Sequence, residues 1–246
     1  MRLIFFYFLL LLVLSAPAAA LAEVTNGLVG WWTFNEGSGT TAADSSSRFG
    51  ATAHDGTLTN GPTWSTGPRG GAATFDGSDD YILVGDAASL QIPNFTVMLW
   101  LYPTNLAMGQ WQPLVTKTNN GGQNRNYGLY LNLSNPTVHY SFQAIDCTTF
   151  RSYDSTGNIT ANQWTHIAMT YNGTSFVLYM NGRLDSSRAI SGTPCITTDP
   201  LRISESTATY RTLYGSIDDV RIYNRPLSAA EIRDVYQGGN ENFGGE

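Results

Sequence analysis

The chain has 246 residues and a formal charge of −6 at neutral pH; 42% of its residues are hydrophobic and only 13% are charged. It contains no long run of lysine or arginine, which argues against binding to nucleic acid or to an anionic membrane surface. The length suits a single all-β domain.

The first 22 residues differ from the rest of the chain. Arg2 precedes an apolar run over residues 3–14, and residues 20–22 read Ala-Leu-Ala. The run is shorter than the roughly 20 residues that a membrane span needs, and the small residues behind it are typical of a cleavage site. We expect a signal peptide over residues 1–22, a product secreted to the extracellular space, cell surface or periplasm, and no transmembrane span after cleavage. The alternative is a retained N-terminal anchor.

Short β-rich segments then alternate with loops rich in Gly, Asn, Ser and Thr. The clearest are the two segments that end at Asn172-Gly173 and at Asn181-Gly182, because Asn-Gly favours a two-residue type I′ hairpin turn. Eleven strands at this spacing predict a two-sheet antiparallel sandwich. We expect them at residues 28–34, 72–75, 81–84, 96–102, 113–116, 127–133, 138–143, 166–171, 175–180, 201–204 and 216–223.

One helix is predicted near the C-terminus. Ser228 followed by Glu231 forms a capping-box pattern, and Ile232, Val235 and Tyr236 would form the apolar face. Gly238-Gly239 would end the helix. We expect the domain to span residues 23–239 and residues 240–246 to form a flexible tail.

The chain has two cysteines, Cys147 and Cys195. Export would place them in an oxidising compartment, where a disulfide persists. We therefore predict that they pair; two buried free thiols are the alternative.

The tryptophans divide into two groups. Trp31, Trp32, Trp100 and Trp164 lie in or beside predicted strands, which indicates packing in the core. Trp64 and Trp111 lie in predicted loops, where an aromatic side chain can serve as a platform for a sugar or can cap one end of the sandwich.

Five blocks of sequence, in order, carry a family resemblance. Residues 27–44, 75–82 and 95–100, the two Asn-Gly segments and residues 215–232 resemble the laminin G-like jelly rolls of the concanavalin A-like lectin/glucanase superfamily. The last block is also similar to the C-terminus of pentraxins. The resemblance extends from about Gly27 to Gly239 and implies an all-β jelly-roll sandwich with one short C-terminal helix. This fold carries several kinds of function, so function has to be argued from a site.

The resemblance also implies a structural calcium. Asp218 stands where superfamily members often hold this ion, and the resemblance implies that backbone carbonyls are further ligands. A side chain from residues 36–55 could add to them, with Asp44 as the first and Glu36 as the second choice. The alternative is that Asp44 starts an Asx-turn, while Asp218 and Asp219 pair with Arg221 or Arg225. The pentraxin pattern of two ligand-presenting calcium ions matches poorly, because Asn119, Asn120 and Glu205 offer a single carboxylate.

Residues 75–82 are rich in aspartate but lack the spacing of an EF-hand. Asp76-Gly77 instead predicts a hairpin turn between two strands, with Asp79 and Asp80 pointing to solvent.

Catalysis is not expected. Retaining glycosidases need two carboxylates about 5 Å apart, and the Glu-x-Asp-x-(x)-Glu strand motif of laminarinase-type hydrolases is missing. Jelly-roll polysaccharide lyases use Gln, His, Tyr and Arg on a concave face. Residues 138–143 hint at this, because alternation places His139, Ser141 and Gln143 on one face.

We therefore expect a secreted, non-catalytic module that recognises a polysaccharide or glycoconjugate. The alternative is an extracellular module for protein-protein interaction, surface assembly or adhesion, and a divergent glycoside hydrolase or polysaccharide lyase ranks third. The side chains expected to bind the glycan combine aromatic rings with planar polar groups. They are Trp111, Asn119, Asn120, Arg125, Tyr210 and Arg211.

Overall fold

The computed structural model describes residues 23–106, 109–119, 124–132, 134–205 and 212–238. The expected signal peptide and the tail from residue 240 lie outside these residues. Within them, two antiparallel eight-stranded sheets pack face to face as a sandwich, which confirms the predicted fold class.

The first sheet, named sheet A, contains the long central strands. β1 (Leu28–Trp32) pairs with the C-terminal half of β16 (Tyr214–Tyr223), and β5 (Gly70–Asp76) pairs with the N-terminal half of β16. The remaining order is β14 (Arg183–Ala189), β13 (Ser175–Met180), β12 (Thr165–Tyr171), β7 (Phe95–Pro103), β16 (Tyr214–Tyr223), β5 (Gly70–Asp76) and β4 (Thr63–Gly67).

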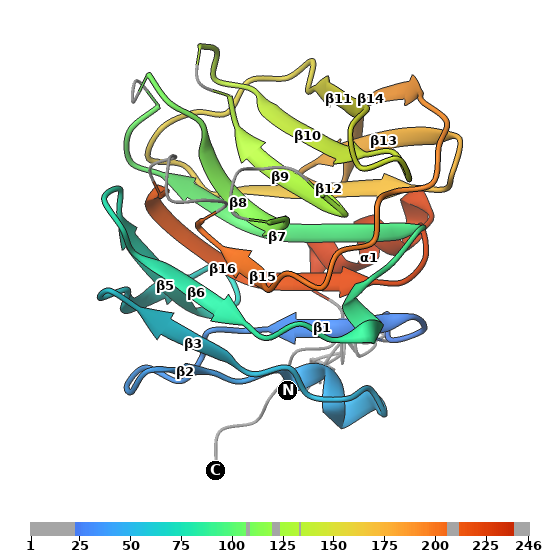
Figure 1. The fold of residues 1–246 in the computed structure, drawn as a ribbon. Helices are drawn as coiled ribbons and strands as arrows, with labels where there is room; N and C mark the ends of the chain where they lie inside the picture. The colour runs from blue at the N-terminus through green and yellow to red at the C-terminus, as the bar shows by residue number, and fades with distance from the viewer. Residues whose placement is uncertain (1–22, 107–108, 120–123, 133, 206–211, 239–246) are drawn as a thin grey trace, which may run out of the picture.

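The second sheet, named sheet B, runs from bottom to top in Figure 1. Its strands β9, β10 and β11, of which β11 is the edge strand, carry the residues described in the next subsection. The order is β2 (Thr41–Ala42), β3 (Gly56–Thr59), β6 (Tyr81–Val84), β15 (Leu201–Ile203), β8 (Gln112–Lys117), β9 (Tyr127–Leu131), β10 (Val138–Gln143) and β11 (Phe150–Asp154).

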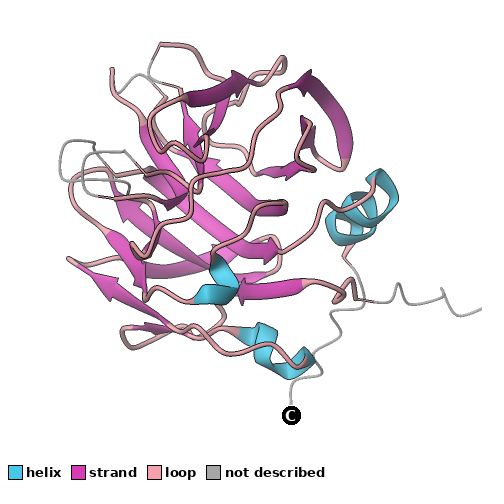
Figure 2. Cartoon of the chain, turned by 45° about the vertical axis from the view of Figure 1, so that its right-hand side comes forward, coloured by secondary structure: helices cyan, strands magenta, loops and turns pink. Residues whose placement is uncertain are grey.

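Sheet A is covered on both faces. Phe95, Val97 and Leu99 of β7 point into the main core between the sheets, whereas Met98 joins a second apolar cluster with Ile232 and Val235 of α1 (Ala229–Gln237). Helical structure is limited in the described residues to α1 and two 3₁₀ segments, η1 (Ser45–Phe49) and η2 (Ala88–Leu90), as Figure 2 shows. Among the described elements, α1 packs on the outer face of sheet A and no helix packs in the same way on the outer face of sheet B.

The C-terminal helix confirms its prediction. Ser228 accepts a hydrogen bond from the Glu231 amide, the Glu231 side chain bonds back to Ser228, and Gly238 ends the helix in the left-handed conformation. Tyr236 stacks on Trp100 with ring centroids 5.5 Å apart.

The two Asn-Gly segments differ. Asn181 and Gly182 both have positive φ and form the two-residue connection between β13 and β14, as predicted. At Asn172-Gly173 only the glycine has positive φ, and the connection from β12 to β13 has three residues. The Asn172 side chain accepts the amides of Thr174 and Ser175, so the two-residue turn predicted there is wrong.

All eleven predicted strands are present, but β2, β3, β4, β11 and β14 were not predicted. These five are short or exposed strands at or near sheet edges, so they lack the apolar alternation of a half-buried strand. Trp64 lies in β4 rather than in a loop and packs half-buried against Phe34.

Candidate functional site

Three neighbouring strands of sheet B place polar and aromatic side chains in register on the face turned away from the core. Tyr130 of β9 is the partner of His139 in β10, which is the partner of Asp154 in β11. Side chains alternate along a strand, and the neighbouring Leu129 and Tyr140 belong to the main core. Tyr130, His139 and Asp154 therefore form one row across the outer face.

A second row lies beside the first. Gly128, Ser141 and Ser152 are successive partners in the same three strands. Gly128 leaves space for Arg125, because a Cβ there would come 2.9 Å from Cδ of Arg125 and 2.7 Å from the Tyr130 ring. The Arg125 guanidinium donates to Oγ of Ser141 at 2.5 Å, and the Arg125 amide donates to Oε1 of Gln143 at 2.8 Å.

Aromatic rings surround this guanidinium. It lies 4.8 Å from the ring centroid of Tyr130 and 5.2 Å from that of Phe150. Trp111 lies just before β8. The centroid of its ring is 4.6 Å from that of the His139 ring, and the ring meets Tyr130 edge-on. Together they form a pocket of about 230 Å³, lined by Trp111, Arg125, Tyr130, His139, Phe150 and Ser152.

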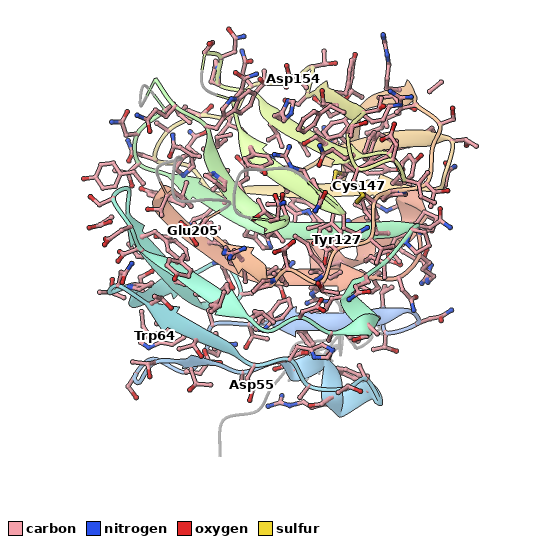
Figure 3. All side chains as sticks on the ribbon, viewed as in Figure 1. Asp55, Trp64, Tyr127, Cys147, Asp154 and Glu205 are labelled. Carbon is pink, nitrogen blue, oxygen red and sulfur yellow. A yellow bond between two sulfur atoms is a disulfide. The ribbon has the colours of Figure 1, made fainter. Side chains whose placement is uncertain are left out.

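His139 has a fixed orientation in this pocket. Its Nδ1 lies 2.7 Å from Oδ1 of Asp154. Burial lowers the pKa of His139, and nearby Arg125 lowers it further, although Asp154 acts in the opposite direction. The imidazole is therefore neutral at neutral pH, with Nδ1–H donating to Asp154 and Nε2 left as an acceptor. Figure 3 labels Asp154 at the top of the molecule, far from Trp64.

The structure brings together two of the predicted glycan-binding residues. Trp111 and Arg125 line the same pocket, and His139, Ser141 and Gln143 share one face as predicted. Asn119 is not among the residues that line the pocket. Three further predicted residues, Asn120, Tyr210 and Arg211, lie outside the described residues.

Sequence reasoning missed Tyr130, Phe150, Ser152 and Asp154. Tyr130 was in a predicted strand, but its pairing with His139 depends on the register between β9 and β10, which the local sequence does not reveal. The other three belong to β11, whose sequence Phe-Arg-Ser-Tyr-Asp lacks a regular apolar–polar alternation, so the strand itself was not predicted.

The predicted calcium ligands already accept protein hydrogen bonds. The Asp44 carboxylate is buried and accepts the amides of Trp31 at 2.8 Å, Ser46 at 2.9 Å and His54 at 2.9 Å, so that it caps η1. This is the Asx-type arrangement considered as the alternative. Glu36 accepts the amide of Ala43.

Asp218 is fully buried and accepts the Arg69 amide at 2.8 Å. Asp219 pairs with Arg221 at 2.9 Å, as the alternative also expected. Among the described residues, the carboxylates of Asp218, Asp44 and Glu36 do not converge within 4.8 Å of one another. Backbone carbonyls would have to supply most of the ligands of an ion at Asp218, and the calcium site stays a prediction.

The described carboxylates that do converge are those of Asp76, Asp79 and Asp80. The hairpin predicted there is wrong, because β5 belongs to sheet A and β6 to sheet B, so these residues form a crossover between sheets. Asp80 is buried rather than solvent-facing and accepts the Asp76 amide. Burial raises the pKa of Asp80, and repulsion from Asp76 and Asp79 adds to the effect.

Two other predictions concern the loops. Cys147 and Cys195 form the predicted disulfide, which links the β10–β11 turn to the segment before β15. Glu205 pairs with Arg202 at 3.2 Å, so its charge is compensated within the protein.

The two packed antiparallel sheets define a domain of the jelly-roll sandwich type. The family model described as "Concanavalin A-like lectin/glucanases superfamily" matches residues 76–233, and the chain belongs to this superfamily. The search of curated proteins found no match.

Solved structures share the fold at low sequence identity. The binding domain of Paraclostridial Mosquitocidal Protein 1 is 17% identical with a TM-score of 0.71; the match covers 87% of this chain and 52% of that one, so the chain spans about half of its length. Domain 4 of AbnA, a GH43 extracellular arabinanase from Geobacillus stearothermophilus in complex with arabinotriose, is 20% identical with a TM-score of 0.66, covering 88% of this chain and 100% of that one.

An enzyme is also among these structures. Trypanosoma rangeli sialidase in complex with the inhibitor DANA is 17% identical with a TM-score of 0.64, and the match covers 90% of this chain but 34% of the sialidase. At these identities the likeness shows the fold alone. Within the described residues, no helix is both long and apolar enough for a membrane span.

Proposed function

We propose that the protein is a secreted, non-catalytic carbohydrate-binding module that holds part of a polysaccharide or glycoconjugate in the pocket beside Trp111. The observation that carries this proposal is the combination of aromatic rings with fixed polar groups in one surface pocket. Aromatic faces pack against the apolar faces of sugar rings, while a few oriented polar groups select the hydroxyls.

Two further features support the proposal. The disulfide between Cys147 and Cys195 is of the kind that persists in oxidising compartments outside the cytoplasm. The six residues that line the pocket include no carboxylate, whereas a retaining glycosidase needs two of them about 5 Å apart. Binding without hydrolysis fits this lining better.

The test is a glycan array followed by calorimetry. The array should contain plant, bacterial and animal glycans, with arabinotriose as the first calorimetric ligand because a domain of similar fold is known in complex with it. We expect the wild-type protein to bind at least one glycan and Trp111→Ala to bind it about tenfold more weakly, a loss of about 1.4 kcal/mol.

A matched pair of phenylalanines controls for general damage. Phe150 is 52% exposed and lines the pocket, whereas Phe49 is 44% exposed and lies elsewhere. Phe150→Ala should weaken binding and Phe49→Ala should not. A wild-type protein that binds nothing on the array would overturn the proposal.

One observation favours the second candidate, an extracellular protein-binding or surface-assembly module. Ile145 and Ile196 are 74% and 49% exposed and lie close in sequence to the two bridged cysteines. Contact surfaces are marked by contiguous exposed apolar patches, so the two isoleucines would have to act together. Self-association or a crosslinked extracellular partner that is lost in Ile145→Ser/Ile196→Ser would support this function, provided that glycan binding is absent.

A further inference from the structure

The size of the pocket limits how much glycan it holds. Its volume of about 230 Å³ lies below the range of about 300–1,000 Å³ typical of sites for drug-sized ligands. A single sugar ring with its substituents suits this volume better than several consecutive rings.

Aromatic rings stand at both ends of the pocket along the strand direction. Trp111 stands at the row formed by Tyr130 and His139. Phe150 is the partner of Gln143, two rows further along the strands, and packs beside Arg125. The site also reaches the β11 edge of sheet B. An internal segment of a polysaccharide has to continue on both sides of each ring, whereas a chain end continues on one side only.

The polar groups of the pocket favour an uncharged sugar. Nδ1 of His139 is engaged with the Asp154 carboxylate, which leaves Nε2 as an acceptor for a hydroxyl proton. The Arg125 guanidinium donates to Ser141 and is covered by two aromatic rings. The carboxylate of an acidic sugar has no proton to give to Nε2 and would approach the negative charge of Asp154.

We infer that the pocket binds one uncharged sugar residue at the end of a glycan chain, and that Nε2 of His139 accepts a hydrogen bond from a hydroxyl of that residue. This inference rests on the proposed carbohydrate-binding function and narrows it to chain ends. Asp154 is a positioning residue, because it acts on the ligand through His139.

The first experiment is competition between the glycan captured on the array and single sugars. The probes are the methyl glycosides of arabinofuranose, galactose, mannose, N-acetylglucosamine and glucuronic acid. We expect a neutral methyl glycoside to compete with an affinity within about tenfold of that of the whole glycan, because most contacts are made to one residue.

The possible results separate the inference from the function on which it rests. If the glycan binds but no methyl glycoside competes, the protein reads internal segments and the inference is wrong, while the proposed function stands. If the glucuronide competes best, the uncharged specificity is wrong. If nothing on the array binds, the proposed function itself fails.

The second experiment tests the role of His139 through pH. Protonation places a proton on Nε2, so affinity for the neutral glycoside should fall at least tenfold between pH 7 and the acid range in which His139 titrates. Asp154 and Arg125 are the charged groups that face this imidazole, and Tyr130 is the neighbouring titratable group. His139→Gln keeps an acceptor and should bind with little pH dependence, whereas His139→Ala should bind at least tenfold more weakly at pH 7.

Two controls complete the design. His54→Ala alters a histidine outside the pocket and should leave the pH profile unchanged. Asp154→Asn removes the carboxylate that fixes the imidazole and should weaken binding with an altered pH profile. An unchanged affinity and pH profile in His139→Ala would refute the assigned hydrogen bond.

Discussion

The guanidinium of Arg221 lies over the indole of Trp31, 4.3 Å from the ring centroid, although the two residues are far apart in sequence. Asp219 bonds to both residues: its carboxylate accepts hydrogen bonds from Nε1 of Trp31 at 2.5 Å and from Nε of Arg221 at 2.9 Å. All three residues are buried, so the first strand and the last strand of sheet A meet through a buried charge pair.

Asp219→Asn should therefore be strongly destabilising. Asparagine tolerates the left-handed backbone of this position, where φ is 52°, but it removes one of the two carboxylates, Asp219 and Glu23, that pair with buried Arg221. Removing one partner of a buried pair typically costs about 3–5 kcal/mol. Urea unfolding followed by tryptophan fluorescence measures the loss. Asp79→Asn, which alters an exposed carboxylate, should change stability by less than about 0.5 kcal/mol.

His166 should make the free energy of unfolding depend on pH. The side chain is fully buried beside Trp100 and Tyr236, and no described residue bonds to either ring nitrogen. Burial lowers its pKa from 6.5 to about 3. Between these values the unfolded chain binds a proton that the folded protein does not, so its stabilising contribution is complete above pH 6.5 and is lost as the pH falls toward 3.

The measurement is urea unfolding of wild type and His166→Phe between pH 7 and pH 4. Wild type should lose up to about 1.4 kcal/mol per pH unit more than the variant, and His54→Ala should follow wild type. Parallel pH profiles for wild type and His166→Phe would show that His166 does not control acid stability.

The strands that were predicted from the sequence are those whose burial appears in the local pattern of apolar residues. β7 and β12 are buried almost throughout because the second sheet covers one face and α1 packs on the other. β11 and β14 were missed because edge strands keep polar residues for solvent.

The candidate site was predictable only in part for a related reason. Period-two alternation placed His139, Ser141 and Gln143 on one face, and residue type selected Trp111 and Arg125. The carboxylate of Asp154 reaches His139 through the register between β10 and β11, which is a tertiary property. The contact between Asp154 and His139 could therefore not be predicted from the sequence around either residue.

The disulfide should stabilise the strand that carries Phe150 and Asp154. It closes a separation of 48 residues, which corresponds to roughly 4 kcal/mol if the loss of chain entropy on cross-linking dominates. Cys147→Ser/Cys195→Ser should therefore lower the thermal midpoint, and dithiothreitol should lower that of wild type but not that of the variant. We also expect weaker glycan binding, because β11 directly follows the bridged turn. An unchanged midpoint after verified reduction would contradict this account.

Asp218→Ala separates a structural role from calcium binding. The variant deprives the Arg69 amide of its buried acceptor, so it should lose about 1–3 kcal/mol of stability. A loss that is the same in EDTA and in calcium would assign Asp218 a structural role alone. A calcium-dependent rise in the wild-type midpoint that the variant lacks would instead restore the predicted site, since a ligand bound only by the folded state stabilises it.

Gly128→Ala tests whether the pocket depends on the space that this glycine leaves. A Cβ would come within 3 Å of both Tyr130 and Arg125, so the guanidinium has to leave its place between the aromatic rings. Glycan binding should weaken at least tenfold while the fold persists, because the displaced side chains lie on the outer face. Gly85→Ala is the matched control, since nothing lies within 4 Å of its added Cβ. Calorimetry with the glycan and thermal unfolding of both variants distinguish a reshaped pocket from a destabilised sheet, and equal binding by both variants would show that the place of Arg125 does not matter to the ligand.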